Sequence, residues 1–168
     1  MNSPREQFSL IYDQYIEKIY RFVYLRVDSQ ETAEDITSRV FMKGWASYQK
    51  DQNITNIGAF LYQIARNDIV DFYKEKEKKA TVSPDAVPEI TDTKTNVYEN
   101  AVFAASIDEV KKAMSDLKHP YQEILTWYYV EDLSAEKIAE LIGKPVGTVR
   151  VMIHRGLESL KGKLIEEA

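Results

Sequence analysis

Apolar residues recur along this chain at intervals of three and four, which places them on one side of an α-helix in segment after segment. The first segment with this spacing, 8–27, has its charged residues on the remaining faces. A second helix, capped by Asp28 or Ser29, is predicted to run to about Ser47, and a third to span 58–78. Only six Gly and five Pro among 168 residues favour long helices with few interruptions.

The periodicity is lost over 80–96, where two Pro and several Thr indicate a linker. Helical spacing returns over 103–117, and further helices are predicted over 121–130, over 134–143 and from Val146 onward.

The predicted fold class is therefore all-α, because no segment shows the alternation typical of a strand. Two small helical domains, 1–79 and 97–168, are expected on either side of the flexible linker 80–96. The linker is acidic and the whole chain has a net charge of -5.

The composition excludes several classes of function. Without Cys there is no disulfide, thiolate zinc site or cysteine nucleophile, and two His cannot supply the three ligands usual at a catalytic zinc. We therefore do not expect redox chemistry or transition-metal catalysis. No apolar stretch approaches the roughly 18 residues of a membrane span. The polar start of the chain lacks the apolar core of a signal peptide, so we expect a cytoplasmic protein without membrane insertion.

The segment from Ser134 onward has the pattern of a helix-turn-helix. Such a motif needs a small residue where two helices cross, a glycine in the turn and a branched apolar residue that anchors the second helix. Ala139, Gly143 and Val149 occur at these positions, and Ser134 is the predicted N-cap of the first helix. An ordinary helical hairpin is the alternative interpretation.

If Val149 faces inward, a set of side chains on the last helix faces away and could enter a major groove. These are Thr148, Arg150, Val151, His154 and Arg155. The stretch 144–163 has five basic residues against one acidic residue, as phosphate binding requires, and Lys161 and Lys163 can reach only the DNA backbone. A solvated cationic surface is the simpler alternative, and His154 could be an ordinary exposed histidine.

These residues resemble a known family. The run Ser134-Ala-Glu-Lys-Ile-Ala-Glu-Leu-Ile-Gly143, followed by Pro145-Val-Gly-Thr-Val-Arg150 and His154-Arg155, is similar to region 4 of the extracytoplasmic-function (ECF) group of bacterial sigma factors. Region 2 of the same group resembles Ala33-Glu-Asp-Ile36, Val40-Phe41, Trp45, Leu61-Tyr-Gln-Ile-Ala-Arg-Asn67 and Asp71. The resemblance implies a non-enzymatic subunit that directs core RNA polymerase to promoters, for which we expect no catalytic residue, no cofactor and no metal site.

In the family, the second helix of region 2 docks on the coiled coil of the polymerase β′ subunit. The resemblance assigns this contact to Glu34, Asp35, Ser38, Arg39 and Met42. Ser38 and Arg39 depart from the family pattern, which usually has a Gln and an acidic residue there.

The resemblance also implies a surface for the −10 promoter element, formed by Lys50, Asn53, Asn56, Arg66, Asn67 and Lys74. The loop 50–56 is similar to one that captures a base flipped from the melted strand, and Asn side chains offer the paired donor and acceptor such a pocket uses. Turn formation is an equally good interpretation of either Asn. Asn67 could instead bond to Asp71, four residues on.

The last helix would then read the −35 element, through Thr148, Arg150, Val151, His154 and Arg155, with Lys161 and Lys163 on phosphates. The expected partners are the β′ and β subunits of core polymerase, promoter DNA and an anti-sigma factor, with no small-molecule substrate. By placement, the linker is similar to a segment that enters the polymerase cleft, although a solvated tether is the simpler alternative.

Two other functions are consistent with parts of the sequence. A stand-alone regulator would pair the helix-turn-helix with a ligand-binding or dimerisation domain, which the region 2 resemblance argues against. A helical hydrolase could use Glu34 and Asp35 as metal ligands, but adjacent carboxylates on a helix point about 100° apart. The chain also lacks a Walker lysine loop and an HExxH pair.

Overall fold

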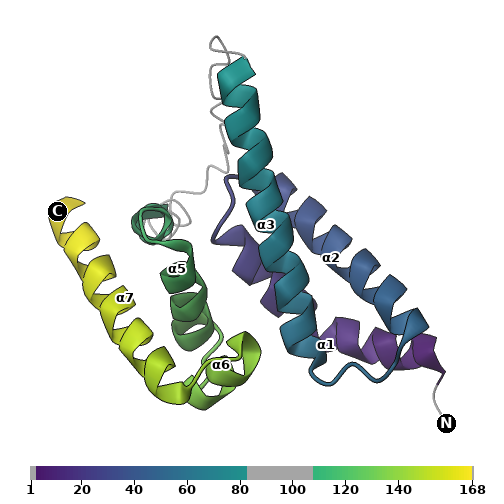
Figure 1. The fold of residues 1–168 in the computed structure, drawn as a ribbon. Helices are drawn as coiled ribbons and strands as arrows, with labels where there is room; N and C mark the ends of the chain where they lie inside the picture. The colour runs from purple at the N-terminus through teal and green to yellow at the C-terminus, as the bar shows by residue number, and fades with distance from the viewer. Residues whose placement is uncertain (1–2, 83–107, 168) are drawn as a thin grey trace, which may run out of the picture. The chain divides into compact units, whose positions relative to one another are not determined.

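The computed structural model describes residues 3–82 and 108–167. The chain divides into two compact units, Met1–Ile90 and Thr91–Ala168. Within the described residues all regular secondary structure is helical, which confirms the predicted all-α fold class (Figure 1).

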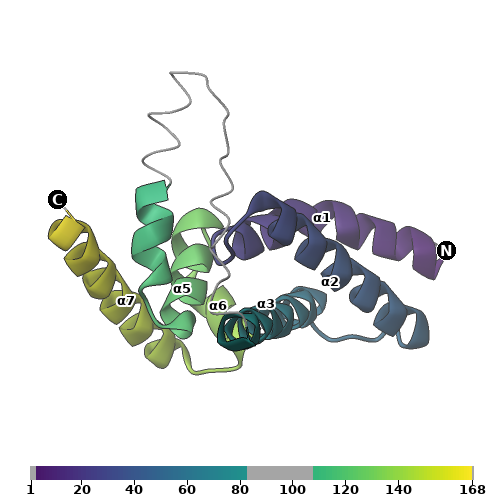
Figure 2. The same ribbon diagram turned by 90° about the horizontal axis from the view of Figure 1, so that it is seen from above.

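Three long helices form the N-terminal unit: α1 (Pro4–Tyr24), α2 (Gln30–Lys50) and α3 (Ile57–Val82). The hydroxyl of Ser3 accepts the Glu6 backbone N–H at the start of α1. Ser29 does the same for Thr32 at the start of α2, so Ser29 is the cap of the two predicted candidates. Figures 1 and 2 show α1 and α2 side by side, and α3 packs against both.

The core of this unit receives side chains from all three helices. The residues without solvent-exposed area are Ile19, Phe22, Val23, Ala33, Ile36, Val40, Leu61, Ala65 and Ile69. Gly44 lies where α2 approaches α3 closely, because a Cβ atom at this position would come within 2.8 Å of the Leu61 side chain. A larger residue at this crossing would therefore have to displace the buried Leu61 side chain from its present position.

Polar contacts also tie α3 to its neighbours. Lys43 Nζ lies 2.6 Å from the buried carboxylate of Asp68, and Lys76 Nζ lies 3.1 Å from Asp28. The Tyr73 hydroxyl donates to the backbone carbonyl of Arg26. Burial is the main cause of a raised pKa at Tyr73, so the phenol stays protonated and remains a donor at neutral pH.

The C-terminal unit combines several short helices with one long helix, α7 (Val146–Glu167). The short helices are a helix over 108–115, α5 (His119–Leu125), the π-helix η1 (Thr126–Val130) and α6 (Ala135–Ile142). One core cluster consists of Met114, Leu117 and Leu125, with Tyr121, Leu157 and Leu160 packed against it. Trp127, Ile138 and Val149 are also fully buried.

Several predicted boundaries differ from the structure. Helix α1 begins at Pro4 instead of residue 8, because Ser3 caps it and proline suits the first helical turn. Helix α3 continues to Val82 and so includes the first residues of the predicted linker. The remainder of that linker, and the apolar residues Phe103 and Ile107, lie outside the described residues.

The segment 121–130 is not one regular α-helix as predicted. After Leu125 the chain makes a π turn, in which the Glu131 N–H donates to the carbonyl of Thr126 at 3.1 Å. This turn buries Trp127 and leaves Tyr128 on the surface, although Ile124, one helical turn earlier, is buried. The extra residue in the turn changes which side chains face inward.

Candidate nucleic-acid and protein interfaces

The helix-turn-helix prediction is confirmed in its local geometry. The Ser134 hydroxyl accepts the Lys137 N–H at the start of α6. Gly143 ends that helix in the left-handed conformation, with φ 67° and ψ 34°, and its N–H donates to Ala139. Val149 then anchors α7 with no exposed area. These contacts fix which side of α7 faces solvent.

The outer side of α7 carries the residues predicted to contact the −35 element. Thr148, Arg150, Val151, His154 and Arg155 are all exposed. Lys161 is exposed further along the helix, and Lys163 is half-buried. The arrangement is that of a helix presenting one face to a ligand while the other is anchored in the core.

Two residues of this face are engaged in ion pairs. Arg150 Nη2 lies 2.6 Å from Glu136 Oε1 of α6, so this pair joins the two helices of the motif. His154 Nε2 lies 3.2 Å from Glu158 Oε1, one turn along α7. Glu136 could not be identified from the sequence, because its contact with Arg150 depends on the angle at which the helices cross.

In the N-terminal unit, Lys50 at the end of α2 is exposed, as are Asn53 and Asn56 in the loop that leads to α3. The Asn56 carboxamide oxygen accepts the Ala59 N–H at 3.0 Å, and so caps α3. The Asn53 backbone N–H donates to the Asp51 carboxylate at 2.9 Å, which closes a tight turn. The cap occupies the Asn56 oxygen, whereas the turn at Asn53 uses only its backbone N–H and leaves the side chain exposed.

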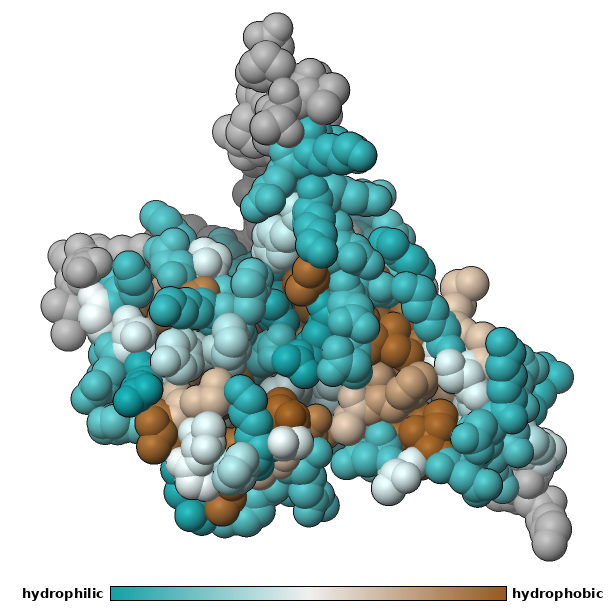
Figure 3. Space-filling model, in the orientation of Figure 1, coloured by the Kyte–Doolittle hydropathy of each residue, from teal (hydrophilic) through white to brown (hydrophobic). Residues whose placement is uncertain are grey.

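Helix α3 carries the other residues predicted for the −10 element. In the first half of the helix, the Gln63 side chain accepts a hydrogen bond from Arg66 at 3.2 Å and donates one to the Asn67 side-chain oxygen at 3.1 Å. Lys74 is exposed further along, in the charged part of the helix. Figure 3 shows this part of α3 as a largely hydrophilic surface.

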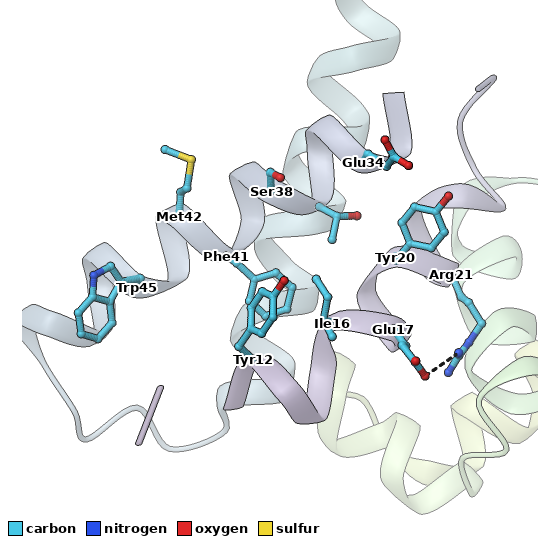
Figure 4. Close-up of a pocket in the computed structure, with 11 residues that line it drawn as sticks. Tyr12, Ile16, Glu17, Tyr20, Arg21, Glu34, Ser38, Phe41, Met42 and Trp45 are labelled. Atoms are coloured by element: carbon cyan, nitrogen blue, oxygen red, sulfur yellow. Dashed lines mark ion pairs between the residues drawn. The ribbon is translucent and has the colours of Figure 1, made fainter. Parts of the chain in front are cut away.

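The residues predicted to bind polymerase lie on the exposed side of α2, next to a groove between α1 and α2 (Figure 4). The groove has a volume of about 640 Å³. Glu34, Ser38 and Met42 line it, whereas Asp35 and Arg39 are exposed on the same helix outside the lining.

The floor of the groove is aromatic and apolar. The rings of Tyr12 and Phe41 meet edge to face with their centroids 5.0 Å apart, and Ile16 and Trp45 extend the lining. Met42 is 69% exposed beside them. Apolar spacing along a helix does not distinguish residues that line such a groove from residues of a core.

The far end of the groove is polar. The Glu17 carboxylate lies 3.7 Å from Arg21, and Glu34 faces Tyr20 across the opening. Partial burial, and then the negative charge of Glu34, raise the pKa of Tyr20 above its usual value. The phenol is therefore a neutral hydrogen-bond donor at neutral pH.

The described residues hold no group of three His, Cys, Asp or Glu side chains placed to bind a metal ion. None of the helices within the described ranges combines the length and the apolar character needed to span a membrane.

Comparison with known families matches two regions of the chain in order. The family model "Sigma-70 region 2" matches 11–79, and "Sigma-70, region 4" matches 107–160. The chain belongs to the sigma-70 family. Its curated relatives are RNA polymerase sigma factors of the ECF type, which identifies the chain as a sigma factor of this group. Sigma factors are transcription initiation factors and not enzymes.

Three relatives illustrate the similarity. BldN of Streptomyces coelicolor is 27% identical over 168 residues, which cover 97% of this chain and 62% of BldN. This chain therefore spans less than two thirds of the length of BldN. SigM of Bacillus subtilis is 25% identical, over 90% of this chain and 91% of SigM. SigW of the same organism is 28% identical, over 95% of this chain and 90% of SigW.

Solved structures show the same fold. The sigma factor RpoE of Bartonella quintana, in complex with the anti-sigma factor NepR, has a TM-score of 0.64 at 21% identity, over 94% of this chain and 96% of RpoE. CnrH, in complex with the cytosolic domain of CnrY, has a TM-score of 0.70 at 14% identity, over 96% of this chain and 89% of CnrH.

Proposed function

We propose that this sigma factor binds core RNA polymerase through its N-terminal unit and selects promoters with two separate DNA-binding surfaces. The observation that carries the proposal is the ordered match of region 2 and region 4 to two helical units. Residues 11–79 match region 2, whereas a stand-alone regulator would need a ligand-binding or dimerisation domain in this part of the chain. The chain itself would supply no catalytic group.

The proposed −35 surface is the exposed side of α7. Arg155 and Arg150 can present guanidinium groups to guanine in the major groove, and Val151 and Thr148 can contact a thymine methyl group. His154 lies on the same side, and Lys161 and Lys163 lie further along, where they would contact phosphates.

The proposed −10 surface combines the loop 51–56 with the exposed side of α3. The Asn53 side chain is the better candidate for reading a flipped base, since the Asn56 oxygen already caps α3. Lys50 and Lys74 add positive charge, as phosphate contacts require. Hydrogen bonds with the Gln63 side chain orient Arg66 and Asn67, which lie on α3 between the loop and Lys74.

The proposed polymerase contact centres on the groove lined by Glu34, Ser38 and Met42, with Asp35 and Arg39 beside it. An aromatic floor with an exposed methionine and a charged rim is typical of a surface that receives a partner helix. Core polymerase would contact this side through β′, and the C-terminal unit would meet β. We also propose an anti-sigma factor as a competing partner that covers these same surfaces.

Run-off transcription on genomic fragments tests this function. Purified core polymerase is assayed with and without the protein, and we expect start sites that occur only when the protein is present. The free protein should bind duplex DNA weakly, because its net charge of -5 repels phosphate. Tight and specific DNA binding without polymerase, and no new start sites, would support the stand-alone regulator instead.

On α7 we expect Arg155→Ala to relax the preference for one base pair of the −35 element. Loss of a bidentate contact to guanine should cost about 1–3 kcal/mol on the preferred sequence and little on the others. Binding of the reconstituted holoenzyme to a library of single-base −35 variants measures this effect.

A double variant, Lys161→Ala with Lys163→Ala, is the control for phosphate contacts. We expect it to weaken binding to every library member by a similar factor and to reduce the dependence of binding on salt. If Arg155→Ala behaved in the same uniform way, Arg155 would be a phosphate contact and not a base reader.

A further inference from the structure

The ion pair between Glu136 and Arg150 connects the two helices of the helix-turn-helix. Their closest atoms are 2.6 Å apart, although the residues are 14 positions apart in the sequence. Both side chains are 61% exposed, so the pair lies on the surface that α6 and α7 offer to a ligand. Within the described part of the chain, the neighbouring Arg155 has no ion pair of this kind.

The position of Glu136 places its carboxylate both in the first turn of α6 and close to Arg150. Glu136 lies in the first turn of α6, two residues after the cap Ser134, where the helix dipole favours a negative charge. An Arg side chain has five N–H donors in a rigid fork. Because the contact with Glu136 uses one terminal nitrogen, the remaining donors stay available on a guanidinium whose direction is restrained.

The charge of Glu136 also affects which ligand Arg150 can accept. A phosphate that approached Arg150 would come close to the Glu136 carboxylate and be repelled by it. The edge of a base carries no net charge, and guanine offers two acceptors that match a guanidinium fork. The pair therefore favours a base over the DNA backbone as the ligand of Arg150.

We propose that Glu136 is a positioning residue that makes Arg150 a specificity-determining contact to one base of the −35 element. This inference rests on the proposed −35 role of α7. Glu136 itself does not need to touch DNA. Without it, Arg150 would be free to bind phosphate and would add affinity without sequence preference.

The test uses full-length protein in reconstituted holoenzyme. The variants are Glu136→Ala, Arg150→Ala and the double variant, each bound to the library of single-base −35 variants at several salt concentrations. Glu140→Ala is the matched control, because Glu140 lies on the same helix with similar exposure but pairs with Lys137 of α6 and not with α7. Exposed pairs contribute little to folding, so all variants should remain folded.

We expect Glu136→Ala to reduce discrimination at one base pair by at least about threefold, and Arg150→Ala to remove discrimination at that same pair. For Glu136→Ala only, the affinity of the holoenzyme for DNA should fall more steeply with salt concentration, by the increment expected for about one additional phosphate contact. The double variant should match Arg150→Ala. The control should raise affinity for all sequences alike.

Two results would overturn the inference. Only the second would also contradict the proposed −35 function of α7. If wild type and Arg150→Ala differ at one base pair but Glu136→Ala behaves like Glu140→Ala, only the positioning role of Glu136 is lost. If the wild-type holoenzyme shows no base preference at any −35 position, the proposed function of α7 fails as well.

Discussion

Replacing Phe22 with alanine is expected to lower the free energy of unfolding of the N-terminal unit by about 3–5 kcal/mol. Phe22 has no exposed area, and its ring contacts Tyr62 edge to face at a centroid distance of 5.2 Å. The Arg26 guanidinium also lies 5.6 Å from the ring centre. Domains of this size have total stabilities of about 5–15 kcal/mol, so the loss would leave much of the unit unfolded on mild heating.

Urea denaturation followed by circular dichroism measures this effect, with Leu10→Ala as the control. Leu10 is on the same helix but is 61% exposed, so its removal should change stability by less than about 0.5 kcal/mol. A loss below about 1 kcal/mol for Phe22→Ala would mean that the three helices do not share the core described here.

Replacing Met42 with glutamate should weaken binding to core polymerase by about 30-fold or more, which corresponds to roughly 2 kcal/mol. Met42 lies beside the aromatic floor of the groove, where a docked partner helix would exclude water. A glutamate there would bury an unpaired carboxylate in the complex, beside the aromatic and apolar floor of the groove. Competition for core polymerase against the wild-type protein gives the ratio of affinities.

Leu10→Glu is the control for this substitution, since Leu10 is also an exposed apolar residue but does not line the groove. It adds the same charge to the same unit and should leave binding almost unchanged. Equal losses for Met42→Glu and Leu10→Glu would place the polymerase contact elsewhere. Thermal unfolding of both variants separates a binding defect from loss of the fold.

Features that depend on a few neighbouring residues were predictable from the sequence. The caps Ser29 and Ser134 depend on a side-chain oxygen and the next backbone N–H groups, and Gly143 on the left-handed turn that glycine allows. The inward position of Val149 follows from its spacing to these residues. Each involves contacts within one or two helical turns, where the sequence alone determines which groups can meet.

Features that depend on contacts between helices were not predictable. Tyr12 and Phe41 carry the same apolar signal as the core, and only the separation of α1 and α2 turns their contact into the floor of a groove. The bond from Glu136 to Arg150 similarly depends on how α6 crosses α7. Sequence periodicity gives the face of each helix but not the distance or angle between faces.

The π turn of η1 affects how this chain is aligned with any relative whose helix is regular at this point. In a π turn the backbone hydrogen bond joins residues five positions apart, instead of four as in an α-helix. The turn therefore contains one extra residue and corresponds to a single-residue insertion in a regular helix. Without a gap at this point, an alignment would offset α5 by one position, or about 100° around the helix axis. The buried Ile124 would then be compared with a residue that faces another direction in the relative.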